Sequence, residues 1–409
     1  MLTYFTTRSS SEKLRAGILA PHLDGFAAWL WDLGYSHTTA QPYLRVVADF
    51  SRWLERRGFD AHDVDETHAR QFLRLRRRRR LHRGDWAALR LAIRYMRELG
   101  IVAPASAAID DEQVSLEHAF AAYLLREKGV APATEKNYGR EIAEFLRHRF
   151  RGRRIDASAL RVRDLHQFVM WRAQHVAPTR VKLSVTALRA FCQFLRFRGD
   201  TASDLASSVL TVPKWRLATL PKSIPPEQVE RILAQCDRRT VVGRRNFAIL
   251  LLLARLGLRA SEVVGLTLDD IDWEAGELTV QGKGSRIERL PLPQDVGKAV
   301  AAYLKRGRPR CSSRNVFIRA HAPFVGFSSA AAISTIVEDA IDRAGLDPPS
   351  RGAHLLRYSL ATRTLGRGGS LAEIAELLRH RHPDTTALYA KVDLEALRSI
   401  APRWPGAHR

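Results

Sequence analysis

Candidate catalytic side chains occur in four clusters in the C-terminal part of the chain. In chain order these are Leu256-Gly257-Leu258-Arg259-Ala260-Ser261-Glu262, Gly282-Lys283-Gly284, His354-Leu355-Leu356-Arg357, and Leu378-Arg379-His380 followed nine residues later by Tyr389. Arginine and lysine bind phosphate oxygens, histidine and lysine move protons, and tyrosine can act as a nucleophile. The four clusters together indicate chemistry at a phosphate ester.

The two arginines offer what a reacting phosphate needs. A guanidinium group is a rigid and permanently charged fork that matches phosphate oxygens. Arg259 and Arg357 could hold both non-bridging oxygens of one phosphate and stabilise the charge that develops in its transition state. The i, i+3 spacing of His354 and Arg357 predicts that both lie on one helix face. Glu262 is expected to orient neighbouring groups rather than to react.

Tyr389 is the candidate nucleophile, because a clamped phosphate flanked by His354 and His380 would stabilise its developing phenolate. The departing 5′ oxygen needs a proton, for which Lys283 on its glycine-flanked turn is the candidate general acid. Each residue alone has a plainer explanation. Arg259 could be a surface ion-pair partner, His354 a core histidine, Lys283 part of an ordinary turn and Tyr389 a packing residue. The hypothesis therefore depends on the ordered set.

The histidines also allow a metal-binding alternative. His380, His382 and Asp384 form a compact H-x-H-x-D pattern, and Pro383 interrupts any helix there. No further ligand stands at a plausible spacing, so the sequence predicts no metal site.

The elements that must position these residues predict a mixed, mainly helical domain over residues 226–409. Pro226 suits the first turn of a helix, and the apolar run Phe247–Leu256 predicts a second helix that Gly257 ends. Leu278 and Val280 alternate with polar residues, and Ile287 lies between Arg286 and Glu288. The intervening Gly282-Lys283-Gly284 therefore predicts a β-hairpin with the lysine at its tip.

An internal repeat indicates two helical bundles upstream, over residues 1–110 and 111–205. At a constant offset of 95 residues, Gly34 matches Gly129, Thr39 matches Thr134, Tyr43 matches Tyr138 and Phe50 matches Phe145. Apolar residues in both copies recur every three to four residues, which is typical of one buried helix face. The alternative is that two unrelated amphipathic bundles share this pattern by chance.

The composition excludes several classes of protein. The 409 residues are 45% hydrophobic, which excludes general disorder, and the formal net charge is +23. Such a charge, with a pI near 10.7, favours a polyanionic partner. The longest apolar run, Phe247–Ala254, is too short to span a membrane, and the N-terminus has no apolar segment of a secretory signal. Three widely spaced cysteines predict neither disulfides nor a zinc site. We therefore expect a cytoplasmic protein that acts on nucleic acid.

Basic segments outside the catalytic clusters are candidates for phosphate contacts. A run of like charges repels itself unless a polyanion neutralises it, although a solvated helix face is the plainer explanation. A basic, proline-containing linker is predicted over residues 206–225. The candidate DNA-contacting residues of the run and the linker are Arg76, Arg77, Arg78, Arg79, Arg80, Lys214 and Arg216.

The ordered set of catalytic residues resembles the tyrosine recombinases, or phage integrase family. The family's pattern is an arginine within G-x-R-x-S-E, a hairpin lysine, H-x-x-R, a histidine, and a tyrosine nine residues later. This sequence carries the pattern at Arg259, Lys283, His354 with Arg357, His380 and Tyr389. The resemblance covers residues 226–400, and the repeated helical segment resembles the family's SAM-like core-binding domain, present twice.

The resemblance implies a DNA breaking-rejoining fold with all-helical N-terminal bundles and a small antiparallel sheet in the catalytic domain. It implies site-specific recombination or integration of double-stranded DNA through a 3′-phosphotyrosyl intermediate, in the service of a mobile element or replicon. No metal or nucleotide cofactor is implied. Strand exchange between two duplexes implies four protomers on DNA, of one or two kinds, and the segment with Leu394, Leu397 and Ile400 could pack on a neighbour or on its own domain.

Three departures from the family pattern and two alternative functions stay open. Many members have one core-binding domain, so its duplication here is a departure, and the resemblance does not assign a DNA footprint to the extra copy. Arg379 stands where the family often has glycine, so it could contact a phosphate or cover a helix end, and Tyr358 stands where histidine is common. The chain could instead be an accessory DNA-binding protein without catalysis, or an enzyme similar to type IB topoisomerases. A membrane-surface role would explain the charge but none of the motifs.

Overall fold

The computed structural model describes residues 4, 14–76, 84–103, 112–151, 154–211, 222–282, 286–380, 386 and 389. Over these residues the chain is mainly helical, with one three-stranded antiparallel sheet, as the sequence predicted. It divides into two compact units, one formed by Met1–Ala103 with Thr219–Arg409 and the other by Pro104–Ala218. No helix in the described part of the chain is long and apolar enough to cross a membrane.

The first helical bundle surrounds a core of its own. Its helices are η1 (Ala20–His22), α2 (Leu23–Asp32), α3 (His37–Arg56), α4 (Glu66–Arg76) and α5 (Asp85–Glu98). Apolar residues at helical spacing, among them Phe26, Leu44 and Phe50, are fully buried between these helices.

The second bundle has a separate core and, among its described residues, likewise contains four α-helices and one 3-10 helix, although the 3-10 helix here lies between the second and third α-helices. It contains α6 (Glu112–Arg126), α7 (Pro132–Phe150), η2 (Ala157–Ala159), α8 (Val162–His175) and α9 (Pro178–Arg198). Helix α7 begins at Pro132 and α3 at His37, which is the offset of 95 residues found in the sequence repeat. Phe120, Phe145 and Phe191 occupy the core of this bundle. That the first bundle is also a SAM-like domain stays a prediction.

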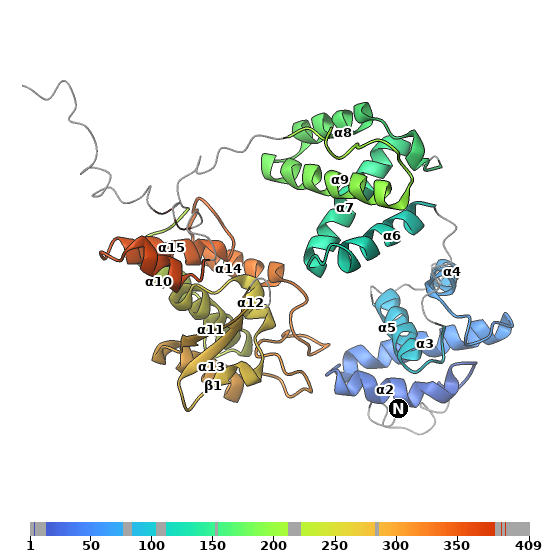
Figure 1. Cartoon of the computed structure of the whole chain (residues 1–409). Helices are drawn as coiled ribbons and strands as arrows, with labels where there is room; N and C mark the ends of the chain where they lie inside the picture. Colours follow the sequence, from blue (N-terminus) through green and yellow to red (C-terminus); the bar gives the residue numbers. More distant parts are fainter. Residues whose placement is uncertain are drawn as a thin grey trace, which may run out of the picture. The chain divides into compact units, whose positions relative to one another are not determined.

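The C-terminal part places helix α11 (Val241–Leu256) at its centre. Helices α10 (Pro226–Ala234), α12 (Ala260–Gly265), α13 (Gln294–Arg306), α14 (Ala330–Arg343) and α15 (His354–Leu365) all pack against α11 (Figure 1). Helix α16 (Leu371–Leu377) packs against α15 and begins with the capping box of Ser370 and Glu373. The nearly continuous apolar sequence of α11 explains its central place, because such a helix is buried on all sides.

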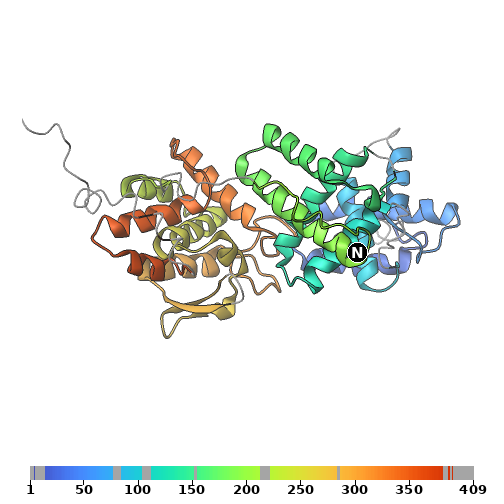
Figure 2. The same ribbon diagram turned by 45° about the horizontal axis from the view of Figure 1, so that its top comes forward.

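The sheet consists of β1 (Ile271–Asp272), β2 (Glu277–Gln281) and β3 (Ile287–Pro291), which follow the short 3-10 helix η3 (Leu268–Asp270) (Figure 2, yellow). Strands β2 and β3 form the predicted hairpin, with Val280 opposite Glu288. Leu278 and Val280 face the core, as the alternation predicted. Ile287 is 67% exposed, so it does not contribute to the core. Its neighbour Glu288 is partly buried instead, because an arginine described below supplies a counter-charge.

Candidate active site

Arg259 lies at the junction between helices α11 and α12. Gly257 ends α11 in the left-handed conformation, with φ of +57°. A Cβ atom at this position would lie 2.8 Å from the Leu378 side chain, so this close approach requires glycine. Arg259 is the N-cap residue just before α12. Its Nη1 donates to Glu262 Oε1 at 2.5 Å and its backbone N–H donates to Glu262 Oε2 at 2.9 Å. Glu262 thus holds both the backbone and the guanidinium group of Arg259.

Arg357 comes from helix α15 and is only 3% exposed. Its Nη1 donates to the carbonyl oxygen of Gly257, and its Nη2 donates to the carbonyl oxygen of Leu378. The side chain therefore fastens the end of α11 to the end of α16. Burial, followed by the positive charges of Arg259 and Arg379, lowers the pKa of Arg357 to about 10, so the guanidinium stays charged at neutral pH. Each terminal nitrogen keeps a second hydrogen for another acceptor.

Both candidate histidines belong to this cationic site. His354 is the first residue of α15, and its side chain is exposed at the surface of the site. Desolvation, followed by Arg357 and Arg259, lowers its pKa below 6.5. His380 lies just beyond α16, and its Nδ1 is 2.8 Å from the Thr386 hydroxyl. Desolvation, followed by Arg357, Arg259 and Arg379, lowers the pKa of His380 to about 4. Both rings are neutral near pH 7, and their pKa shifts have the same two arginines among their causes.

The titration of His380 in the DNA-free protein tests this arrangement. We expect a midpoint near pH 4 by NMR of labelled histidine, with His380→Gln identifying the signal. Because the unfolded chain takes up this proton near pH 6.5, His380 should reduce the stability of the fold as the pH falls from 6.5 towards 4. A midpoint near 6.5 would contradict the placement of this ring beside the arginines.

Tyr389 is 1% exposed and lies beside His380 and Tyr358. Its ring is parallel to that of His380, with centroids 6.4 Å apart, and it meets Tyr358 edge-on at 6.1 Å. Tyr358 in turn stacks on His354 at 5.9 Å. The Tyr389 hydroxyl has no hydrogen-bond partner among the described residues. Burial and Tyr358 raise the pKa of Tyr389 while Arg357 opposes the rise, so the phenol is fully protonated in the DNA-free protein.

Sequence analysis left the role of Arg379 open and did not assign Glu288 or Thr386 to the site. Arg379 does not merely cover a helix end, because its side chain is 5% exposed and pairs with Glu262 and Glu288. Thr386 bonds His380. The sequence signal for the role of Arg379 was that an arginine stands where the family often has glycine. Glu288 had no such signal, because the alternation of strand β3 does not distinguish it.

Several predicted residues lie outside the described part of the chain or away from the site. Lys283 lies outside the described residues, although the hairpin that carries it is present. Arg76 is described, and its Nη1 pairs with Asp49 at 2.6 Å, so its side chain is engaged within the first bundle. A phosphate contact by Arg76 therefore stays a prediction. The following candidates also lie outside the described residues: Arg77, Arg78, Arg79, Arg80, Lys214, Arg216, His382 and Asp384.

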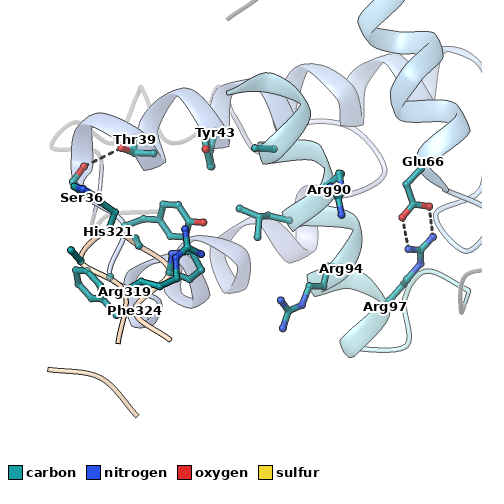
Figure 3. Close-up of a pocket in the computed structure, with 17 residues that line it drawn as sticks. Ser36, Thr39, Tyr43, Glu66, Arg90, Arg94, Arg97, Arg319, His321 and Phe324 are labelled. Carbon is teal, nitrogen blue, oxygen red and sulfur yellow. Dashed lines mark hydrogen bonds and ion pairs between the residues drawn. The ribbon is translucent and has the colours of Figure 1, made fainter. Parts of the chain in front are cut away.

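A pocket of about 820 Å³ lies apart from this site, between the first bundle and a loop of the C-terminal part (Figure 3). The backbone N–H of Phe324 in this loop donates to the Leu33 carbonyl oxygen at 2.9 Å. Several basic side chains line the pocket, but Arg97 is engaged by Glu66, with its Nη1 2.6 Å from Oε1. None of the described candidate catalytic residues lines it.

Comparison with known sequences finds family matches in the second helical bundle and in the C-terminal part. A model of the phage integrase family matches residues 222–395, and a model of the family's N-terminal SAM-like domain matches residues 118–199. The Sinorhizobium fredii protein y4rA, named as an integrase/recombinase, is 42% identical over 393 residues, which cover 95% of each chain. The tyrosine recombinase XerD of Mycobacterium tuberculosis is 32% identical over 303 residues, covering 70% of this chain and 94% of XerD.

Solved structures show the same fold at low sequence identity. XerH recombinase bound to a palindromic difH substrate gives a TM-score of 0.53 with 18% identity, covering 75% of this chain and 92% of XerH. A lambda integrase dimer bound to a core site gives a TM-score of 0.51 with 14% identity, covering 67% and 94%.

The matching family models and these relatives define the class of protein, an enzyme that breaks and rejoins DNA. The chain belongs to the phage integrase family, the tyrosine recombinases.

Proposed function

We propose that this chain is a site-specific recombinase or integrase that cuts DNA through a covalent bond between Tyr389 and a 3′ phosphate. The observation that carries the proposal is that Arg259 and Arg357 both donate to carbonyl groups of the segment just before His380, whose ring lies parallel to that of Tyr389. His354 joins this group through Tyr358, which contacts both His354 and Tyr389. These groups come from segments about 130 residues apart in the sequence, so their convergence is a property of the fold. The excess of positive charge among them suits a phosphate group.

The proposed reaction assigns one role to each group. Arg259 and Arg357 hold the non-bridging oxygens, with Glu262 orienting Arg259. The Tyr389 oxygen forms a bond to phosphorus as the bond from phosphorus to the 5′ oxygen breaks. Neutral His354 accepts the phenolic proton, and His380 donates a hydrogen bond to the phosphoryl oxygen. Lys283 protonates the departing 5′ oxygen, and rejoining reverses these steps.

DNA binding is assigned to all parts of the chain. We infer that the bundles at 1–110 and 111–205, the linker 206–225 with Lys214 and Arg216, and the catalytic domain 226–409 together surround the duplex. The net charge of +23 supports this assignment, because each neutralised phosphate releases counterions. XerH and lambda integrase were solved with DNA. We further propose that four protomers assemble on two duplexes. The reaction would take place in the cytoplasm and serve a mobile element or replicon.

A plasmid assay tests the proposed function. Purified protein is incubated with supercoiled plasmids that carry two copies of the DNA flanking its own gene. We expect rearranged circles with new junctions, identified by sequencing, and none with Tyr389→Phe. Relaxed circles without new junctions would favour topoisomerase activity. Tight binding of this DNA without any covalent adduct would favour the accessory-factor alternative.

A further inference from the structure

Arg379 has an unusual backbone conformation for an arginine. Its φ is +55°, in the left-handed region that residues with a Cβ rarely adopt. The residue lies between the end of helix α16 and His380, where its backbone N–H donates to the Glu376 carbonyl oxygen at 2.9 Å. Glycine would adopt this conformation without steric cost. The side chain must therefore contribute something that glycine does not.

The guanidinium group of Arg379 connects two carboxylates from different elements. Its Nη2 is 3.0 Å from Glu262 Oε2 on helix α12, and its Nε is 3.4 Å from Glu288 Oε2 on strand β3. Its Nη1 donates to the carbonyl oxygens of Leu256 and Leu377, each at 3.3 Å. The group is thus enclosed by protein acceptors.

Arg379 also touches Arg259 through its backbone. Its carbonyl oxygen accepts a hydrogen bond from Arg259 Nη2 at 3.2 Å. Glu262 stands between the two arginines, since one carboxylate oxygen faces Arg259 Nη1 and the other faces Arg379 Nη2. Arg379 therefore supports Arg259 twice, through a shared carboxylate and through its own carbonyl group.

The balance of charge explains why the side chain matters. Glu262 has a side-chain exposure of 2% and Arg379 one of 5%, so water screens their interaction weakly. Without Arg379, the full charge of Glu262 would act on Arg259 and offset the positive charge that a phosphate needs. Glu288 would also lose the cation that holds it inward, and strand β3 would lose its tie to helix α12.

We propose that Arg379 is a positioning residue. It neutralises the Oε2 atom of Glu262 and connects strand β3 to the part of the site that contains Arg259. The proposal rests on the proposed function, because it concerns the same phosphate site. Arg379 acts through Arg259 and Glu288 and does not contact the phosphate, since its side chain is enclosed. This role differs from the phosphate contact that the sequence alone left open.

The test compares Arg379→Gly and Arg379→Lys with the wild type in single-turnover formation of the Tyr389 adduct on nicked DNA. We expect Arg379→Gly to slow adduct formation at saturating DNA about 10- to 100-fold, by analogy with the loss of residues that orient metal ligands. The Kd for DNA should change less than about twofold, because no phosphate contact is lost. Arg379→Lys keeps the charge and should recover part of the rate.

Glu288→Gln tests the contact between Arg379 and strand β3, and Glu277→Gln is its control. Glu288→Gln should slow the reaction, and its combination with Arg379→Gly should be no slower than Arg379→Gly alone, because both remove the same contact. Glu277 lies on the same hairpin and faces Arg289 at 3.9 Å on the surface, so Glu277→Gln is the matched control with an unchanged rate.

Three outcomes would overturn the proposal. An unchanged rate with Arg379→Gly, while the wild type forms its adduct, would refute positioning and leave the proposed function intact. A weaker Kd with a smaller salt dependence would identify Arg379 as a phosphate contact instead. Absence of any Tyr389 adduct in the wild type would overturn the proposed function and this inference with it.

Discussion

Replacing Tyr389 by phenylalanine is expected to abolish covalent attachment of the protein to DNA. Phenylalanine keeps the ring but lacks the oxygen that would bond to phosphorus. Loss of a catalytic nucleophile lowers the rate on the order of 10⁶-fold, so no adduct should be visible after hours. Denaturing gels of protein mixed with nicked duplexes from the DNA flanking its gene measure this directly, because only a covalent adduct survives denaturation.

The same substitution should leave the fold intact. The Tyr389 hydroxyl is buried without a hydrogen-bond partner among the described residues, so its removal deletes an unfavourable group. We expect the variant to be as stable as the wild type or more stable by about 1 kcal/mol, as measured by denaturant unfolding. An adduct that persists in Tyr389→Phe would show that another residue is the nucleophile.

Arg357→Ala should cause the second largest loss of activity. The substitution removes a charged donor that remains protonated in its buried site, where it stabilises charge most effectively. We expect adduct formation to slow about 10³-fold, at the upper end of the cost of losing one such donor. Affinity for DNA should change little, because one contact among many is lost. Rates at saturating DNA, measured beside binding titrations, separate the two effects.

This substitution also has a structural cost that requires its own control. Arg357 donates to the carbonyl groups of Gly257 and Leu378, and alanine leaves both without that partner. A loss of about 2–4 kcal/mol in the free energy of unfolding is expected. Arg357→Lys keeps the charge and restores part of the stability, but a single ammonium cannot replace the fork, so its rate should stay low. Full activity in Arg357→Lys would contradict the proposal that Arg259 and Arg357 together hold the non-bridging oxygens of the phosphate.

The sequence predicted the elements around the site wherever a local rule governs the backbone. Gly257 after an apolar run predicted the end of α11, and paired glycines between alternating strands predicted the hairpin. The spacing of His354 and Arg357 predicted a shared helix, and both residues do lie on α15. Their opposite exposure did not follow from spacing, because burial depends on the helices that pack on each side.

What could not be predicted depends on contacts between distant segments. Arg379 was noted as a departure from glycine, but its direction is set by Glu262 and Glu288, which lie about 120 and 90 residues earlier. Likewise, burial of Tyr389 results from the side chains that surround its ring. Local propensity contains no information about such tertiary contacts.

The surroundings of Tyr389 have a consequence for the energy of local motions. Among the described residues, Tyr389 belongs to a small apolar cluster with Ala361, Ile374 and Leu378, which is separate from the large core around α11. Small satellite clusters open at a lower free energy than the whole domain, because few apolar contacts are lost. We therefore expect opening of this cluster alone to expose the tyrosine while α11 and its neighbours stay folded.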